Sequence, residues 1–380
     1  MKSTDERRGA ADPRGSRGSR GSRGSRTRAL SGAAGVGMLA LTACGEAPDE
    51  AEAAGEELDY QACLVSDTSG WDDQSFNQSA RSGLNAAIED FGVDSSLAES
   101  QSDAEYAPNV DSMVQQGCDL VFGVGFLLQE AVQDAAEENP DTDFALIDEV
   151  FTDGDDVVEM ENGKPLQFNT AEAAYLAGFV AAAMSETGTV GTFGGIHVPP
   201  VAVFMDGFAD GVDRYNEETG EDVDVVGWDK EAQQGSFTGD FENQAQGRAL
   251  TEQLLSQGAD VIMPVAGLVG LGAAAAIEED GEAMMIWVDE DGYETTDYGD
   301  IILTSVLKDI STAVYDTIEE SADGGFSHEP YVGTLENGGV GLAPFHDFED
   351  DVPVEVVEQL EEIQQEIIDG ETVVETENAP

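Results

Sequence analysis

Short apolar runs alternate with amphipathic stretches along most of the chain. Runs such as 61–66 and 120–125 end at polar or glycine-rich turns, and each precedes a stretch with helical spacing. In residues 76–91, for example, apolar side chains recur every three or four positions, which is typical of a helix with one buried face. The pattern therefore predicts a repeated succession of strand, loop and helix.

Several of the predicted strands are apolar throughout, and this composition indicates the type of sheet they form. Strands of this kind, alternating with helices, are typical of parallel sheets that are covered on both faces. The sequence therefore predicts an α/β fold built on parallel sheets. We expect strands at 61–66, 120–125, 144–148, 189–194, 223–228, 260–265 and 284–289, and helices at 76–91, 127–139, 171–186, 201–217, 241–257, 268–280 and 352–368.

Composition excludes several classes of protein. The 380 residues include 15 Lys and Arg against 80 Asp and Glu, a net charge of −65, while 41% of residues are hydrophobic. That hydrophobic fraction is too high for a wholly disordered chain, and the acidity excludes nucleic acid as a partner because phosphate contacts need a basic face. No apolar stretch approaches the roughly 20 residues needed to cross a bilayer.

The N-terminus has the pattern of an export signal. Nine basic residues fall within residues 1–28, and an uncharged, largely apolar or small segment follows, ending at Cys44. Residues 41–45, Leu-Thr-Ala-Cys-Gly, resemble a bacterial lipobox, which predicts a lipoprotein signal peptide at 1–43, lipidation of Cys44 and an acidic tether at 44–58. The alternative is a plain signal peptide with a chance cysteine. The lipoprotein interpretation places the protein on the extracytoplasmic face of the cell membrane.

Removal of residues 1–43 would make the chain still more acidic. Nine basic and three acidic residues would be lost, which leaves 6 basic and 77 acidic residues. Such an excess repels itself in dilute buffer and is tolerated when salt screens it. We therefore hypothesise a host from a saline habitat.

Two cysteines remain in the expected folded part, Cys63 and Cys118. Both lie near the starts of predicted strands that would be neighbours in a parallel sheet. Outside the cytoplasm such a pair can be oxidised, so a disulfide is geometrically possible. Two buried free thiols are the equally acceptable alternative.

Polar residues follow three of the predicted strands. Asp67, Asp148 and Asp289 come at strand ends, and Gly267 follows another strand. In parallel α/β sheets ligands bind beyond the carboxyl ends of the strands, where carboxylates can accept hydrogen bonds from hydroxyl or ring N–H groups. A single Asp in such a place is more often a turn or helix-cap residue, but three together favour a binding site.

Signs of catalysis are absent from the sequence. The three histidines have no metal-ligand spacing, and neither a phosphate-binding loop nor a nucleophile elbow occurs. The glycine-rich stretch 267–272 is not in the dinucleotide-binding order, and is read either as close approach to a ligand or as helix packing. Residues 289–292 lack the rest of a calcium loop. We therefore expect no enzyme activity, cofactor or metal, and interpret the protein as a receptor for a small solute.

The segment Val65–Asn77 closely resembles the N-terminal signature of the basic membrane protein family of ABC-transporter substrate-binding lipoproteins. Weaker matches follow in order over residues 60–370, at 103–108, 125–131, 145–148, 265–267, 286–289 and 303–308. The resemblance, which is to the purine nucleoside receptors in particular, implies the type I periplasmic-binding fold with two Rossmann-like lobes. By analogy the first lobe takes 59–169 and 266–303, the second takes 170–265 and 304–380, and the chain crosses between them near Asn169, Ala266 and Thr304.

The resemblance also implies a role for each matching residue. Phe76 would stack on a base, and Asp67, Asn77 and Asp148 would bind its polar edges. Gly267 would allow close approach, Asp289 would accept ribose hydroxyls, and Lys308 would donate to a ligand oxygen or balance the acidic pocket. Each has a structural alternative as a core, cap or charge-neutralising residue.

One departure from the family pattern concerns the second face of the base. Nucleoside-binding relatives place an aromatic residue before the Val-Ala-Gly segment, where this chain has Ile262, Met263 and Pro264. Met263 can lie against a ring through its polarizable sulfur, but it does not form a rigid sandwich. This leaves room for another nucleoside or another ring-bearing solute.

The resemblance favours a protein that delivers a small solute, a purine nucleoside above all, to an ABC permease and its ATPase. Two alternatives remain. The Asp cluster could belong to an exported nucleoside-processing enzyme, or the same fold could serve a signalling receptor without a transporter. Release of free base would identify the first alternative.

Overall fold

The computed structural model describes residues 58–154 and 156–380. The predicted signal peptide at 1–43, the lipidation site at Cys44 and all but the last residue of the predicted tether lie outside the described residues.

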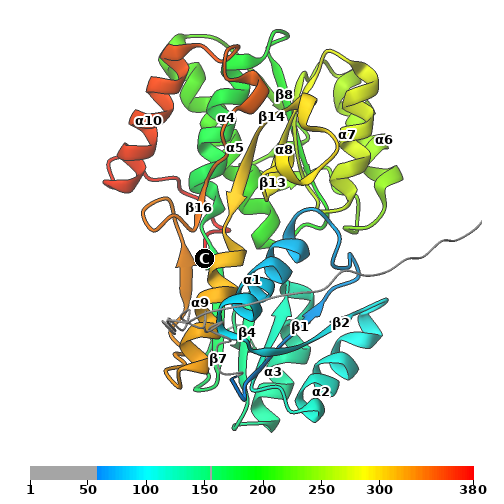
Figure 1. Cartoon of the computed structure of the whole chain (residues 1–380). Coiled ribbons are helices and arrows are strands. Elements are labelled where there is room, and N and C mark those ends of the chain that lie inside the picture. Colours follow the sequence, from blue (N-terminus) through cyan, green and yellow to red (C-terminus); the bar gives the residue numbers. More distant parts are fainter. Residues whose placement is uncertain (1–57, 155) are drawn as a thin grey trace, which may run out of the picture. The chain divides into compact units, whose positions relative to one another are not determined.

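Two six-stranded sheets organise the described chain (Figure 1). The first has the order β15-β7-β4-β3-β1-β2 and is parallel throughout. The second has the order β16-β14-β13-β12-β8-β9 and is parallel except for the β14–β16 pair. The first sheet comprises β1 (Gln61–Ser66), β2 (Asp94–Glu99), β3 (Leu120–Val124), β4 (Asp143–Ile147), β7 (Gly163–Phe168) and β15 (Tyr331–Gly333). The second comprises β8 (Thr189–Gly194), β9 (Asp224–Val226), β12 (Val261–Val265), β13 (Met284–Asp289), β14 (Ile302–Lys308) and β16 (Val340–Leu342).

Each sheet and the helices packed on it form one lobe. The first lobe consists of residues 58–168 and 310–333, with α1 (Phe76–Phe91), α2 (Tyr106–Gln116), α3 (Gln129–Glu138) and α9 (Ile310–Ala322). The second consists of residues 170–308 and 340–380, with α4 (Thr170–Met184), α5 (Pro199–Thr219), α6 (Gln244–Ser256), α7 (Val269–Asp280), α8 (Gly292–Thr295) and α10 (Val354–Ile368). Two short hairpins, β5 (Thr152–Asp153) with β6 (Asp156–Val157) and β10 (Trp228–Asp229) with β11 (Gln234–Gly235), complete the strands. None of the described helices has the length and apolar composition needed to cross a membrane.

Alternate residues of each strand face different helix layers, which is why these strands are apolar throughout. In β1, Cys63 and Val65 belong to the apolar cluster that contains residues of α2 and α3. Ala62 and Leu64 belong to the cluster that contains residues of α1 and α9. Helices therefore cover both faces of the first sheet, and the predicted α/β fold with parallel sheets is confirmed.

The division of the chain between the lobes differs from the expected one. Assignment of 266–303 to the first lobe is wrong, because β13 pairs with β12 and β14 of the second sheet. The chain leaves the first sheet after Phe168, returns after Lys308 through α9 to β15, and crosses finally between Gly333 and Val340. The expected crossings near Ala266 and Thr304 therefore lie inside the second lobe.

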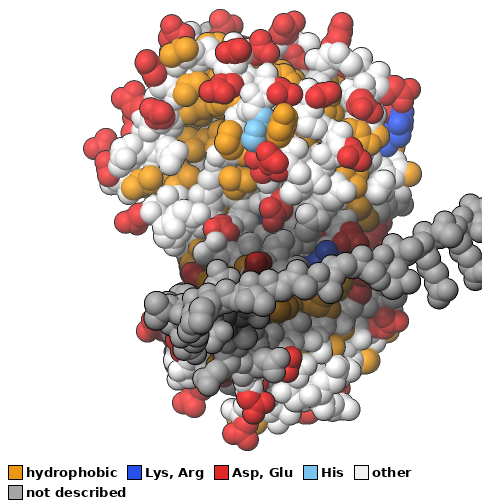
Figure 2. Space-filling model, viewed as in Figure 1, with side chains coloured by type: hydrophobic (Ala, Val, Ile, Leu, Met, Phe, Trp, Pro, Cys, Tyr) orange, Lys and Arg blue, Asp and Glu red, His pale blue; other side chains and the backbone are white. Residues whose placement is uncertain are grey.

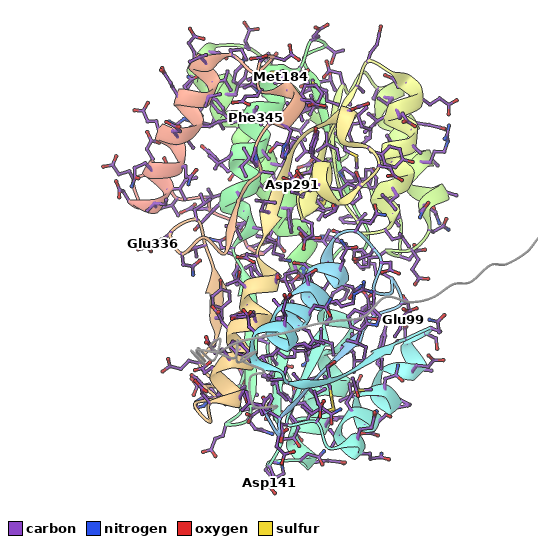
Figure 3. All side chains as sticks on the ribbon, in the orientation of Figure 1. Glu99, Asp141, Met184, Asp291, Glu336 and Phe345 are labelled. Carbon is purple, nitrogen blue, oxygen red and sulfur yellow. A yellow bond between two sulfur atoms is a disulfide. The ribbon has the colours of Figure 1, made fainter. Side chains whose placement is uncertain are left out.

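A disulfide joins Cys63 of β1 to Cys118, which lies two residues before β3. The two Cα atoms are 6.0 Å apart, as expected for residues at the starts of neighbouring strands. The structure therefore resolves the choice between a disulfide and two thiols in favour of the disulfide, which is visible as the yellow bond in Figure 3.

The segment after α10 is fastened to the second lobe and ends between the lobes. Thr376 and Asn378 donate hydrogen bonds to the buried carboxylate of Asp206, and the Lys230 ammonium donates to the Glu375 carbonyl over 2.6 Å. Residues 378–380 share one small cavity with residues 148–149 and 167–168 of the first lobe and with residues 199, 200 and 203 of the second. Figure 1 marks this C-terminal end between the two lobes.

The carboxyl ends of the first sheet's strands point toward the second lobe. Glu99, at the carboxyl end of β2, lies near the level where the lobes meet in Figure 3, whereas Asp141, just before β4, lies at the far end of the first lobe. Because all strands of this sheet are parallel, Asp67 and Asp148, which follow β1 and β4, share the inner edge with Glu99.

Candidate ligand-binding site between the lobes

The loop between β1 and α1 positions the first group of polar side chains. The Asp67 carboxylate accepts hydrogen bonds from the Ser69 N–H over 3.0 Å and from the Asn77 amide nitrogen over 2.8 Å. Asp73 stabilises the start of α1, because its carboxylate accepts the backbone N–H groups of residues 75, 77 and 78 over 2.9–3.2 Å. These bonds fix Phe76 and Asn77 at the first turn of the helix, facing the second lobe.

Asn77 has one polar atom with no partner in the described chain. Its side chain is 1% exposed, and its Nδ2 group is used by Asp67, but its Oδ1 atom is buried without a hydrogen bond. An unpaired buried acceptor costs free energy unless something donates to it. The Asn77 oxygen is therefore suited to accept a hydrogen bond from a bound solute.

Asp148 and Asp289 occupy an unusual backbone conformation. Their φ angles are +67° and +71°, in the left-handed region that non-glycine residues rarely adopt. Asp148 directly follows β4 in the first lobe, and Asp289 is the last residue of β13 in the second. Strain of this kind gathers at functional sites, and here it turns two strand-end carboxylates toward one space between the lobes.

Lys308 pairs with one of these two carboxylates. It ends β14 in the second lobe, is 2% exposed, and makes an ion pair with Asp148 across the junction between the lobes. Its ammonium nitrogen also lies 5.1 Å from the Phe76 ring centroid and 5.4 Å from the Phe204 ring centroid, within the range of cation–π attraction.

A second set of contacts joins the lobes beside this ion pair. The Ser75 hydroxyl donates to Asp289 over 2.5 Å and lies 3.1 Å from the Val288 carbonyl oxygen. The Trp287 indole N–H and the Thr295 hydroxyl both donate to the Gln74 carbonyl, over 3.2 and 3.3 Å. The loop that presents Phe76 and Asn77 is therefore also the main polar contact of the first lobe with β13 and α8.

These residues surround a cavity between the lobes whose empty volume, including the part open to solvent, is about 540 Å³. Of the residues expected from the sequence, the cavity brings together seven, namely Asp67, Phe76, Asn77, Asp148, Gly267, Asp289 and Lys308. Gly267 has a φ of +52° with open space where a side chain would begin.

The expectation for Met263 is wrong. Met263 is fully buried in a large apolar cluster and is not among the residues that line the cavity. Its side chain is on the same face of β12 as that of Val265, but it lies two residues, or about 6.6 Å, deeper along the strand. The strand therefore presents Val265, Ala266 and Gly267 to the cavity instead.

The sequence analysis missed several residues of the cavity wall. They include Asp73 and three aromatic residues, Phe126, Phe204 and Phe241, together with Pro200. The strand-end rule could have found Phe126, because it follows β3 by two residues. Phe241 lies in a loop between β11 and α6, where no pattern in the sequence marks it.

Burial shifts the protonation of the carboxyl groups in the cavity. It raises the pKa of Asp148 to about 6, against the opposing effect of the Lys308 ammonium. Burial likewise raises the pKa of Asp67 and of Asp289, while hydrogen bonds from Asn77 and Ser75 oppose the respective shifts. With one Lys against these acids in its wall, the cavity favours a solute that donates hydrogen bonds and disfavours an anion.

Metal-ligating side chains are not grouped at this site. Within residues 58–154 and 156–380, no three His, Cys, Asp or Glu side chains are placed to hold a metal ion. The cavity wall contains hydrogen-bond acceptors, one ammonium group and aromatic rings. These groups can hold a planar solute with polar edges.

A cavity between two α/β lobes, lined by strand-end polar groups and crossed by an ion pair, defines a two-lobed solute-binding receptor. The family model described as ABC transporter substrate-binding protein PnrA-like matches residues 61–378. The chain belongs to this family, and the resemblance found in the sequence is confirmed.

Relatives and solved structures agree with this assignment. The chain is 30% identical over 341 residues to the ABC transporter nucleoside-binding protein BmpA of Lactococcus lactis, covering 84% of this chain and 90% of the relative. It is 29% identical over 262 residues to basic membrane protein A of Borreliella burgdorferi, covering 68% and 71%. The structure of an ABC transporter solute-binding protein from Aeropyrum pernix K1 superposes with a TM-score of 0.73 at 28% identity, over 82% of this chain and 92% of that one.

Family membership establishes the general role. The protein is the substrate-binding component of an ABC transporter, which binds a small molecule and works with a permease. Such proteins act outside the cytoplasm in association with the membrane.

Proposed function

We propose that this protein is a lipid-anchored receptor that delivers a nucleoside, a purine nucleoside above all, to an ABC importer. The observation that carries the proposal is the pairing of Phe76 with Asn77 at one wall of the cavity, where an aromatic ring adjoins a buried amide oxygen without a partner. The nucleoside-binding relative from Lactococcus lactis supports the choice of solute.

Each wall of the cavity has a part in this proposal. Phe76 stacks on the base, and Asn77, with Asp67 and Asp148, binds its polar edge. Asp289 accepts the ribose hydroxyls, Lys308 donates to a ligand oxygen, and Gly267 allows the solute to approach the backbone. The contact of Ser75 with Asp289 then makes ribose binding and closure of the lobes depend on the same carboxylate.

The test is calorimetric titration of the full chain in high salt with adenosine, guanosine, inosine, cytidine and uridine. We expect one class to bind, and Asp289→Asn to weaken the ribonucleoside by about 10- to 100-fold, because a charge-assisted hydrogen bond contributes about 1.5–3 kcal/mol. The matching 2′-deoxynucleoside should lose less. No heat with any nucleoside would overturn the choice of solute.

Two controls complete this experiment. Asp291→Asn changes a nearby carboxylate that caps α8, pairs with His346 and is not among the residues that line the cavity, so it should bind as the unaltered chain does. Chromatography of the mixture should show intact nucleoside. Accumulation of free base would show instead that the site is that of an exported enzyme.

The anchor is proposed from the lipobox-like residues that precede Cys44. Cys44→Ser should move the protein from the membrane fraction to the soluble fraction of cells that export it, and mass spectrometry should show a lipid on the unaltered N-terminal cysteine. An unmodified Cys44 in the exported protein would exclude the lipoprotein.

A further inference from the structure

One backbone carbonyl of the first lobe receives two hydrogen bonds from the second. The Gln74 carbonyl accepts the Trp287 indole N–H over 3.2 Å and the Thr295 hydroxyl over 3.3 Å. Gln74 lies in the loop between β1 and α1, whereas Trp287 lies in β13 and Thr295 in α8. We call these three groups the Gln74 latch. The latch joins the lobes outside the ligand cavity, because none of its three residues is among those that line the cavity.

Gln74 has a conformation that is unfavourable for the residue by itself. Its φ angle is +58°, in the left-handed region, and its buried side-chain oxygen has no hydrogen-bond partner in the described chain. The preceding residue, Asp73, fixes the loop because its carboxylate accepts the backbone N–H groups of residues 75, 77 and 78. Unfavourable conformations of this kind persist where the surroundings impose them, and they gather at functional positions. Here they accompany the one carbonyl that both second-lobe donors bind.

The donor from β13 is also firmly held. Trp287 is 1% exposed and belongs to an apolar cluster of the second lobe. A Cβ atom on Gly292 would lie 2.5 Å from Cγ of Trp287, and one on Gly270 would lie 2.9 Å from its Cζ3 atom. The indole therefore packs directly against two glycine backbones, and its N–H group reaches the junction between the lobes from a ring with little room to turn.

The latch adjoins both walls of the cavity along the chain. In the first lobe, Asp73 directly precedes Gln74 and lines the cavity. In the second lobe, Val288 and Asp289 directly follow Trp287 and line the cavity as well. A change in the latch therefore alters how closely the two walls are held together, while every group that lines the cavity remains in place.

We propose that the Gln74 latch sets how long the receptor stays closed, with Trp287 and Thr295 as positioning residues that hold the lobes around a solute without touching it. A solute leaves when the lobes separate, and their separation breaks both hydrogen bonds of the latch. The latch therefore affects the release of every solute by the same factor, unlike a residue of the cavity wall. The kinetic test of this inference rests on the proposed function, since its probes are nucleosides.

The first measurement is stopped-flow dissociation of the nucleosides used in the titration. Thr295→Val keeps the shape of the side chain and removes its hydroxyl, and Trp287→Phe keeps an aromatic ring and removes the N–H group. Each variant should speed dissociation by about two- to tenfold, the effect of losing one neutral hydrogen bond. The factor should be the same for every nucleoside that binds. An unchanged rate in Thr295→Val, or a factor that differs between nucleosides, would overturn the latch.

Thr296→Val is the matched control. The Thr295 hydroxyl also donates to the Asp291 carbonyl over 3.0 Å, and the Thr296 hydroxyl donates to the Gly292 carbonyl over 2.7 Å. Each variant therefore loses a hydrogen bond to the carbonyl four residues earlier, but Thr295→Val also loses the bond to the first lobe. Thr296→Val should release nucleoside at the rate of the unaltered chain. Equal acceleration by both variants would overturn the latch and assign the effect to the stability of α8.

A second measurement separates the latch from the choice of solute. In the protein without nucleoside, Thr295→Val in the second lobe should speed amide hydrogen exchange at residues 73–78 of the first lobe, because their loop loses a contact that holds it. Thr296→Val should leave that exchange unchanged. If no nucleoside binds but exchange is faster in Thr295→Val alone, the proposed function fails and the latch stands. Exchange that Thr295→Val does not change overturns the latch, whichever solute binds.

Discussion

Asp73 shows how the burial of a single carboxyl group can affect the stability of the folded chain. It is 1% exposed, and both its oxygens already accept backbone N–H groups at the start of α1. Burial nevertheless raises its pKa to about 7, against the opposing effect of those hydrogen bonds. The protonated form is thus favoured in the folded chain relative to the unfolded chain.

This shift predicts the direction of a pH effect. A carboxyl with a raised pKa contributes most stability below its ordinary pKa near 3.8, and loses that contribution as the pH rises to about 7. We compare the unfolding free energy of the unaltered chain with that of Asp73→Asn. The difference, unaltered chain minus variant, should fall between pH 4 and pH 7. The fall should be up to about 4 kcal/mol, because one pKa unit corresponds to about 1.36 kcal/mol.

Urea unfolding at several pH values measures that difference. Asp72→Asn is the control, because Asp72 is the adjacent carboxyl but its side chain is 88% exposed, in an ion pair with Arg81. The control should follow the unaltered chain across the range. A difference between the unaltered chain and Asp73→Asn that rises with pH would contradict the assignment.

Site residues that obey a general rule of α/β sheets could be predicted, and others could not. Asp67, Asp148 and Asp289 follow strands, and ligands bind at strand ends, so their meeting at one cavity follows from the sequence pattern. The prediction that Met263 binds the ligand was wrong, because Met263 lies two residues before Val265 on the strand, and this distance separates the core from the cavity wall. Phe241 reaches the cavity only through the fold of its loop.

Among elements, burial alone did not decide which strands were predicted, because the largely buried strands β7 and β14 are absent from the expected set. The predicted strands at 61–66, 189–194 and 284–289 agree with β1, β8 and β13 in their bounds. The edge strand β2 was missed, because its residues Asp-Ser-Ser-Leu-Ala-Glu are mostly exposed and contain no apolar run.

It was harder to predict from the sequence which lobe each strand belongs to. The strands β12 and β13 are as apolar as β3 and β4, so composition alone does not tell to which sheet each belongs. The second sheet is identified only by its pairing, in which β13 lies between β12 and β14. The analogy with the family placed two crossings too early in the chain.

At the scale of the whole molecule, the charge is strongly unbalanced. All six Lys and Arg residues of the described chain take part in ion pairs with Asp or Glu. They are Arg81, Lys164, Arg214, Lys230, Arg248 and Lys308. Most carboxylates of the described residues have no such partner. Figure 2 shows Asp and Glu side chains spread over the visible face of the second lobe. Their mutual repulsion opposes the folded state.

Salt should therefore stabilise the protein. The melting temperature should rise most steeply from 10 mM to about 1 M NaCl, because the distance over which charges interact falls from about 30 Å to about 3 Å in that range. A variant with Gln at Glu355, Glu358, Glu361 and Glu362, four exposed positions of α10, should show a shallower rise. A melting temperature independent of salt would remove the hypothesis of a saline habitat.

The C-terminal segment has a practical consequence for anyone who purifies this protein. Residues 378–380 lie in a small space that both lobes border, and that space shares Asp148 and Pro200 with the ligand cavity. An affinity tag fused after Pro380 would begin there, between surfaces that must approach one another. Binding constants measured on such a fusion would report the tag as well as the receptor, so a cleavable handle belongs at a site remote from this end.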